Sequence, residues 1–64
     1  MRIKEIRKKA GLTQIKLAQK MNVGRSTVGM WETGNSLPTA DKLPELAKVL
    51  GCSIDELYGN TEEK

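Results

Sequence analysis

The sequence QIKLAQKMNVGRSTVGMWETG, which spans residues 14–34, decides the fold. Its first part places Leu17, Ala18 and Met21 on one face of a helix, because residues one, three and four positions apart are neighbours on a helical surface. A short turn follows and begins with Asn22, a residue that tolerates a positive φ. A second helix then resumes and ends at a glycine suited to a left-handed cap. Two short helices joined in this way predict a helix-turn-helix.

The second of these helices has two unlike faces. At about 100° per residue, Val28, Trp31 and Glu32 fall on one side, and Ser26 and Met30 fall on the opposite side. A helix that faces water usually carries Glu, Lys and other strong helix formers on its outer side. Here the outer and flanking positions hold small polar groups, a glycine, a methionine and an arginine. Such a face can be pressed into a groove without a row of repelling acids.

The composition excludes several classes of protein. The 64 residues suffice for one small domain, close to the lower limit for folding without disulfides or metals. With no histidine and one cysteine, we expect no metal site and no cofactor. No stretch is long and apolar enough to span a membrane, and the first residues lack the apolar region of a signal peptide. The acids are dispersed and no activated nucleophile is evident, so we do not expect an enzyme.

The single cysteine, Cys52, cannot form an internal disulfide, which suits a reducing cytoplasm. Because free cysteine behaves as a small hydrophobe, we expect Cys52 to be a buried core residue.

The charge is distributed unevenly along the chain. Residues 1–30 contain eight lysines and arginines and one acid, whereas residues 31–64 contain three lysines and seven acids. A basic half that contains the helix-turn-helix suits a polyanion such as nucleic acid. The alternative is an ordinary solvated lysine surface, and the asymmetry of the whole chain weighs against it.

The other segments predict three more helices. The first covers residues 1–10, with Ile3, Ile6 and Ala10 as its core stripe. After a loop over residues 35–38 and a tight turn over residues 39–42, a helix begins near Leu43.

This later helix carries Leu46, Ala47 and Leu50 inward, and Pro44 must lie in or near its first turn because proline cannot donate a hydrogen bond. Ser53 then caps a short last helix, in which Ile54 and Leu57 face inward. The prediction is an all-α domain of five helices over residues 1–58, followed by a polar tail over residues 59–64.

Thr13 and Lys16 mark the start of the helix that begins at Gln14. Thr13 is placed as its N-cap. A lysine in the first turn opposes the helix dipole, so Lys16 makes sense if a phosphate approaches this terminus. Gln14 can hydrogen-bond a phosphate or a base edge, or it can simply be a good helix former. The loop that begins with Asn35 and Ser36 offers backbone N–H groups and short polar side chains.

Arg7 and Glu32 are charged residues that both lie on the core side of their helices, where an unpaired charge is unfavourable. Arg7 shares a face with Ile3, and Glu32 lies on the core side of its helix. An arginine beside a core stripe either extends to solvent or pairs with an acid. Pairing Arg7 with Glu32 satisfies both groups and removes an anion from the nucleic-acid face.

The ordered set of these features resembles the phage-repressor-like (Xre) helix-turn-helix family over residues 3–58. The residues that carry the resemblance are Arg7, Gln14, Leu17, Ala18, Val23, Val28, Glu32, Gly34, Pro38, Leu46, Ala47, Leu50, Gly51 and Leu57. The resemblance implies five packed helices, with the third in the DNA major groove and the N-terminus of the second at the phosphate backbone. It also implies a structural ion pair between Arg7 and Glu32.

We therefore predict a sequence-specific DNA-binding transcriptional regulator that reads the major groove with the helix near residues 25–32. The partner is double-stranded DNA, and the candidate DNA-binding residues are Thr13, Gln14, Lys16, Arg25, Ser26, Thr27, Gly29, Met30, Asn35 and Ser36. The alternative is an antitoxin-like or other protein-interaction module on the same fold. We also expect a homodimer on DNA through the C-terminal helices, with Val49, Leu50 and Tyr58 as candidate contacts, although simple core packing is an alternative role for these residues.

Three residues depart from the family pattern. Asn22 replaces the usual turn glycine, which its tolerance of the left-handed region explains. Gly24 occupies the common Ser or Thr cap position, so the recognition helix has a weaker cap. Gly29 lies inside a helix, at a cost of roughly 0.5–1 kcal/mol relative to alanine. It could admit close approach of the backbone to DNA, or it could reflect a less discriminating helix.

Overall fold

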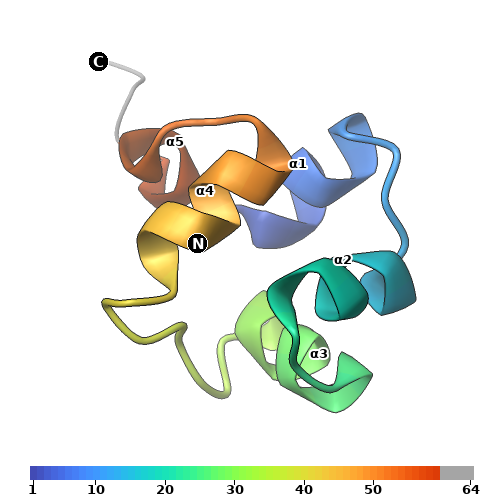
Figure 1. Cartoon of the computed structure of the whole chain (residues 1–64). Coiled ribbons are helices and arrows are strands. Elements are labelled where there is room, and N and C mark those ends of the chain that lie inside the picture. Colours follow the sequence, from blue (N-terminus) through green and yellow to red (C-terminus); the bar gives the residue numbers. More distant parts are fainter. Residues whose placement is uncertain (60–64) are drawn as a thin grey trace.

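The computed structural model describes residues 1–59. Within them five helices follow one another and no strand is present: α1 (Ile3–Lys9), α2 (Gln14–Met21), α3 (Arg25–Thr33), α4 (Leu43–Leu50) and α5 (Ile54–Tyr58). Figure 1 shows α2 and α3 side by side, with α4 packed against both α2 and α5. The predicted all-α fold is confirmed. Of the predicted polar tail, only Gly59 is described, and it caps α5.

The helix-turn-helix forms where the sequence predicts it. Thr13 is the N-cap of α2, and its Oγ1 accepts a hydrogen bond from the backbone N–H of Lys16 at 3.0 Å. Asn22 adopts the left-handed conformation with φ of 60°, which ends α2 and turns the chain toward α3. Gly24 starts α3 without a side-chain cap, and Gly34 ends it with φ of 85°. The positive φ values at Asn22 and Gly34 therefore fix both the turn and the length of α3.

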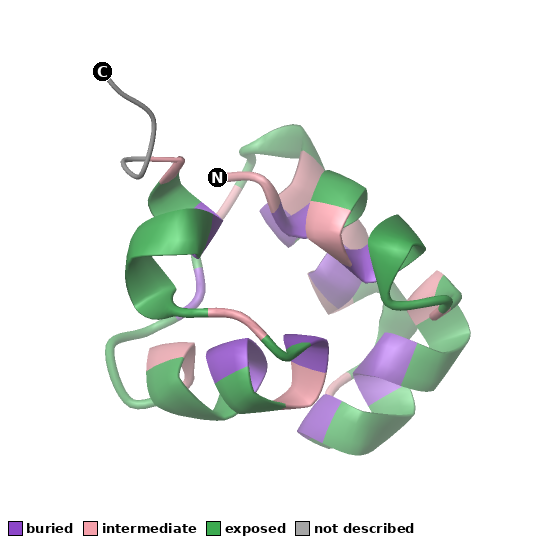
Figure 2. Ribbon diagram, turned by 90° about the horizontal axis from the view of Figure 1, so that it is seen from above, coloured by how far each residue is buried: buried purple, intermediate pink, exposed green. Residues whose placement is uncertain are grey.

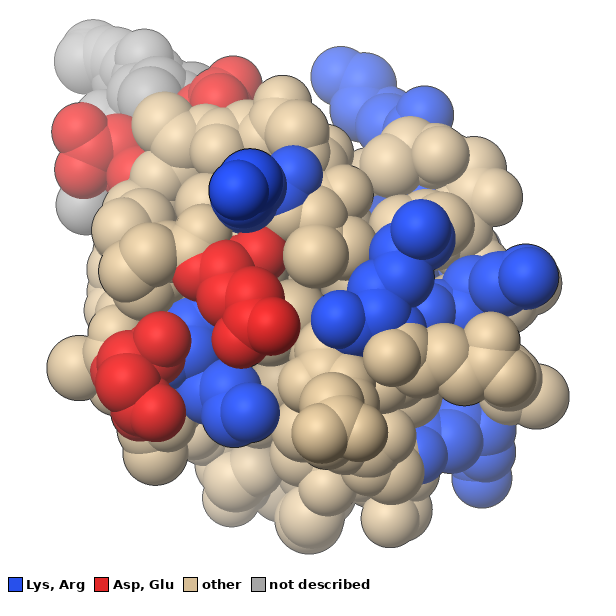
Figure 3. All heavy atoms as spheres, in the orientation of Figure 1, with Lys and Arg blue, Asp and Glu red and all other residues tan. Residues whose placement is uncertain are grey.

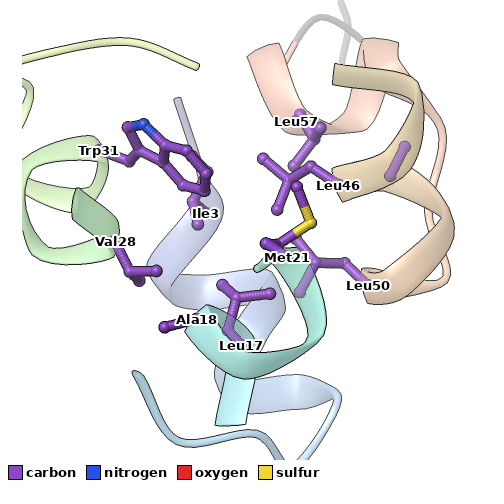
Figure 4. Close-up of a cluster of buried hydrophobic side chains, with 10 residues drawn as sticks. Ile3, Leu17, Ala18, Met21, Val28, Trp31, Leu46, Leu50 and Leu57 are labelled. Atoms are coloured by element: carbon purple, nitrogen blue, oxygen red, sulfur yellow. The ribbon is translucent and has the colours of Figure 1, made fainter. Parts of the chain in front are cut away.

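All five helices contribute to one hydrophobic core. Figure 2 shows the buried positions on the inward sides of the helices, and Figure 4 shows the side chains meeting across them. Each large aliphatic side chain that is fully buried contributes roughly 1.5–3 kcal/mol to stability. The core consists of Ile3, Leu17, Ala18, Met21, Val28, Trp31, Leu46, Ala47, Leu50 and Leu57.

The C-terminal half supports this core with regular local structure. Pro44 lies in the first turn of α4, where its missing N–H has no cost. Ser53 caps α5 in a complete capping box: the Glu56 N–H donates to Ser53 Oγ at 3.1 Å, and the Ser53 N–H donates to Glu56 Oε1 at 2.8 Å. The backbone N–H of Arg2 donates to the carbonyl of Leu57 at 2.7 Å, so α5 is tied to the start of α1.

Three core predictions are wrong. Ala10 is exposed, because α1 ends at Lys9 and the chain turns away beyond it. Ile54 is 37% exposed, because it is the first residue of a very short helix that packs through Leu57. Cys52 is half-buried and packs against the core from the turn between α4 and α5. Burial raises the pKa of its thiol, and the nearby Glu56 carboxylate adds to this effect.

None of the helices within residues 1–59 is both long and apolar enough to cross a membrane.

Candidate nucleic-acid interface

Helix α3 presents one face to the core and the opposite face to solvent. Val28 is fully buried and Trp31 is 4% exposed, so these two side chains fix the rotation of the helix about its axis. Arg25, Ser26 and Met30 are exposed, and Met30 keeps 41% of its surface open although it is apolar. These three residues form what we call the reading face. The predicted division of α3 into a core side and an outer side is confirmed.

A shallow hollow lies beside the reading face, where α1, α2 and α3 meet. Lys4 and Arg7 come from α1 and Arg25 comes from α3. The full lining, which we call the α2 hollow, consists of Lys4, Arg7, Leu12, Thr13, Gln14, Ile15 and Arg25. The hollow therefore combines the basic side chains of Lys4 and Arg25 with the N-terminus of α2, where the first backbone N–H groups have no partner within the helix, while the charge of Arg7 is paired with Glu32. This combination suits an anion.

Arg7 and Glu32 form the ion pair that the sequence predicts, and it is buried. Arg7 Nε donates to Glu32 Oε2 at 2.6 Å, and Nη2 donates to Oε1 at 3.4 Å. The Arg7 side chain is 8% exposed and that of Glu32 is 4% exposed. The remaining guanidinium nitrogen, Nη1, donates to the carbonyl of Leu12 at 2.7 Å. The pair thus joins α1 to α3 and to the loop before α2.

The environment of Glu32 favours its charged form. Burial alone would raise the pKa of this carboxyl, because desolvation penalises the anion. The hydrogen bonds from Arg7 and Gln14, and the Arg7 charge, act in the opposite direction and lower the pKa below its ordinary value. Glu32 is therefore an anion at neutral pH and stays on the inner side of α3.

Gln14 extends this network to the reading face. Its Nε2 donates to Glu32 Oε1 at 2.9 Å, and its Oε1 accepts from Arg25 Nη1 at 3.1 Å. A carboxylate can only accept hydrogen bonds, so Glu32 determines which way the Gln14 amide is turned. The amide oxygen then faces Arg25. A chain of hydrogen bonds consequently runs from Arg7 through Glu32 and Gln14 to the first residue of α3.

The other predicted site residues lie around this centre. Thr13 and Lys16 are exposed at the start of α2, and Asn35 is exposed after α3. Thr27 and Gly29 are half-buried on the flanks of α3.

The backbone N–H of Ser36, expected to be free, instead donates to the carbonyl of Met30 at 3.3 Å. It does so because Gly34 folds the chain back over the last turn of α3. Only the Ser36 side chain then remains for a ligand.

The charge separation seen in the sequence is also present on the surface. Figure 3 shows lysine and arginine side chains gathered over α1 and α2, while the acids lie mainly over α4 and α5 with lysines among them. The basic side is therefore the side that carries the α2 hollow.

Two features of the interface were not predicted. The internal bonds of Gln14 depend on Glu32, which is far away in sequence, and no local pattern indicates them. Lys4, an exposed residue of α1, also lines the α2 hollow. The helical position of Lys4 relative to Arg7, three residues apart on one surface, was the available signal.

Comparisons with known proteins agree with this arrangement. The helix-turn-helix family model matches residues 3–57. The HTH-type transcriptional regulator ImmR of Bacillus subtilis is 38% identical over 61 residues, which are 95% of this chain and 48% of ImmR. The uncharacterized HTH-type transcriptional regulator YazB of the same organism is 41% identical over 56 residues, covering 88% of this chain and 81% of YazB.

A crystal structure of a transcriptional regulator from Listeria innocua superimposes with a TM-score of 0.78 at 34% identity, over 95% of this chain and 57% of that one. The chain thus spans about half the length of some of the relatives it matches. The family match over nearly the whole chain, and the position of α2 and α3 within it, show that the chain belongs to the phage-repressor-like helix-turn-helix family.

Proposed function

We propose that this protein is a sequence-specific DNA-binding transcriptional regulator that places α3 in the major groove of double-stranded DNA. The observation that carries the proposal is the reading face, which is free of acids and exposes an apolar methionine beside a serine and an arginine. The one acid of α3, Glu32, is turned inward and neutralised by Arg7. A helix with this surface fits a polyanionic groove.

The residues around the reading face are suited to contact the phosphate backbone. Phosphate contacts position a protein on DNA, whereas contacts with base edges select the sequence. Thr13, Lys16 and the α2 hollow are suited to phosphate, because they combine backbone N–H groups with positive charge. Gln14 links the phosphate-contacting residues to the reading face, since its side chain accepts a hydrogen bond from Arg25.

The reading face offers three kinds of base contact. Arg25 can donate two hydrogen bonds to a guanine edge, and Ser26 can donate or accept. Met30 has no hydrogen bond to offer and can pack against a thymine methyl group. We assign no catalytic role to these residues. We also place the protein in the cytoplasm, since its single thiol suits a reducing compartment.

The proposal is tested by selecting bound sites from a pool of random duplexes and footprinting the protein on the best of them. A preferred site, bound with an affinity that falls steeply with salt, is expected. Weak and uniform binding to all duplexes would contradict the proposal and would favour a protein-interaction module on the same fold.

Lys16→Ala should weaken binding to all DNA sequences alike. If the Lys16 ammonium neutralises one phosphate, its removal lowers the slope of log affinity against log salt by roughly one unit. Titrations at several salt concentrations, on the selected site and on an unrelated duplex, measure this slope. Lys48→Ala is the matched control, because Lys48 is an exposed residue of α4, and it should leave the slope unchanged. A loss confined to the selected site would assign Lys16 to base recognition instead.

We further propose that two copies bind adjacent half-sites through their C-terminal helices. A single recognition helix reads only a few base pairs, so two copies one helical turn apart give more discrimination. Leu50 is excluded from this contact because it is 5% exposed within the core, and Val49 is half-buried. Ile54 and Tyr58, four residues apart on α5, are 37% and 49% exposed and form the apolar surface that a second copy can cover.

Ile54→Glu should therefore reduce binding to a full site without changing binding to a half-site. The added charge disrupts the contact between copies and lies away from α3. Affinities for duplexes with one and with two half-sites, measured for both proteins, separate the two effects. If the unmodified protein gains nothing from the second half-site, it binds as a monomer and the proposed dimer is wrong.

A further inference from the structure

Gly29 is the one glycine inside a helix among residues 1–59. Gly11, Gly34, Gly51 and Gly59 have positive φ values, which explains glycine at each of these turns. Gly24 is the N-cap of α3. Gly29, by contrast, lies in the middle of α3 with ordinary helical backbone, where glycine is among the least favourable residues.

Nothing among the described residues requires glycine at this position. Apart from the backbone of its own helix and its two chain neighbours, a Cβ atom added to Gly29 would meet no atom of residues 1–59 within 4 Å, so it would point into open space. No side chain of residues 1–59, other than those of its two chain neighbours, lies within 4 Å of the place that a methyl group would occupy. Helix α3 thus gives up stability at Gly29 without any contact inside the molecule that explains it.

The position of Gly29 on α3 suggests what fills this space. It lies one turn after Arg25, beside Ser26, and directly before Met30, so all three residues of the reading face are its neighbours on the helix. Their side chains stand out from the helix, and Gly29 leaves a gap between them about as deep as one methyl group. The backbone N–H and C=O of Gly29 belong to the helix ladder, so the floor of the gap offers no free hydrogen-bonding group.

Among base edges in the major groove, one presents an apolar projection of this size. Thymine carries a C5 methyl group, whereas the other edges present hydrogen-bond donors and acceptors. A hydrogen-bonding group placed directly against Gly29 would lose its water without gaining a partner from the glycine.

We infer that Gly29 is a specificity-determining residue whose missing side chain accepts a thymine methyl group, at a base pair between those contacted by Arg25 and Met30. The inference rests on the proposed function, because it requires α3 to lie in the major groove. It predicts that a methyl group on the protein and a methyl group on the DNA compete for one space.

An exchange of methyl groups tests this directly. Gly29→Ala adds a methyl group to the protein, and deoxyuridine in place of one thymidine removes a methyl group from the DNA. On the selected site, Gly29→Ala should bind at least about tenfold more weakly than the unmodified protein. Each thymidine of the half-site is then replaced in turn by deoxyuridine. At one position this replacement should restore the affinity of Gly29→Ala to within about threefold of the affinity of the unmodified protein for the unmodified site. The other thymidines serve as matched controls.

A stability measurement excludes damage to the fold. Alanine is a better helix former than glycine, so Gly29→Ala should unfold a few degrees higher than the unmodified protein, by roughly 4–8 °C for each kcal/mol gained. Undiminished binding by Gly29→Ala, rescue at no thymidine, or a selected half-site without thymine would each overturn the inference while leaving the proposed function intact. Failure of the unmodified protein to select any site would overturn the proposed function and the inference with it.

Discussion

Glu32→Gln should lower the free energy of unfolding by about 3–5 kcal/mol, the usual result of removing one partner of a buried ion pair. The Arg7 guanidinium, which is only 8% exposed, would then keep its charge without a counter-ion. A domain of this size has a total stability near the lower end of roughly 5–15 kcal/mol. The variant should consequently be close to unfolding at room temperature.

Urea denaturation of both proteins measures this loss. Glu45→Gln is the matched control, because Glu45 is an exposed acid on α4 and its replacement should change stability by no more than about 0.5 kcal/mol. An equally small change for Glu32→Gln would mean that the pair contributes little, as exposed ion pairs do.

The same pair predicts how stability depends on pH. The pKa of Glu32 is lower in the folded protein than in the unfolded chain, so its ionised form stabilises the fold. This contribution is complete above the ordinary carboxyl pKa of 4.5 and is lost as the pH falls through the lowered folded-state value. The difference in stability between the unmodified protein and Glu32→Gln should therefore be constant near neutral pH and should narrow in acid. A difference that does not narrow would exclude the ionised pair as its cause.

Replacement of Glu32 should also change the side-chain arrangement at the reading face. In Glu32→Gln the new amide offers an NH2 donor as well as an acceptor oxygen, so it can pair with the Gln14 amide in either orientation, and the Gln14 oxygen no longer has to face Arg25. The stabilising pair and the arginine that contacts DNA are in this way parts of one network.

The helices and their ends could be predicted from the sequence, because local rules determine them. Thr13, Asn22 and Gly34 each specify a cap or a turn through their own backbone and side-chain preferences. The pairing of Arg7 with Glu32 followed from the placement of each charge on a core side of its helix. Local capping preferences and helical periodicity together were enough for these features.

The burial and orientation of side chains that could not be predicted correctly depend on packing between helices. Ala10 and Ile54 have the correct period for burial but lie at helix ends that no other element covers. Cys52 sits in a turn, where periodicity does not apply, and neighbouring helices cover it only partly. The orientation of Gln14 is set by Glu32, a contact across α2 and α3 that sequence spacing does not reveal.

Simultaneous replacement of Arg25, Ser26 and Met30 by alanine should abolish the preference for the selected site and leave weak, salt-dependent binding to any duplex. Each good base contact contributes about 1–3 kcal/mol of discrimination, so the three together separate a specific site from random DNA. The fold should persist, because all three side chains are exposed and alanine favours a helix. Site selection repeated with the variant, alongside thermal unfolding, gives the measurement.

Single alanine variants then show how much each residue contributes to this preference. Met30→Ala should relax the preference at one or two positions with little change in salt slope, since methionine carries no charge. Arg25→Ala should remove a preference for guanine and also lower the slope if the guanidinium lies near phosphate. An alanine pair at Glu45 and Lys48, exposed on α4, controls for surface changes away from α3. A selected-site profile unchanged by the triple replacement would refute the reading face, because phosphate contacts alone cannot distinguish one sequence from another.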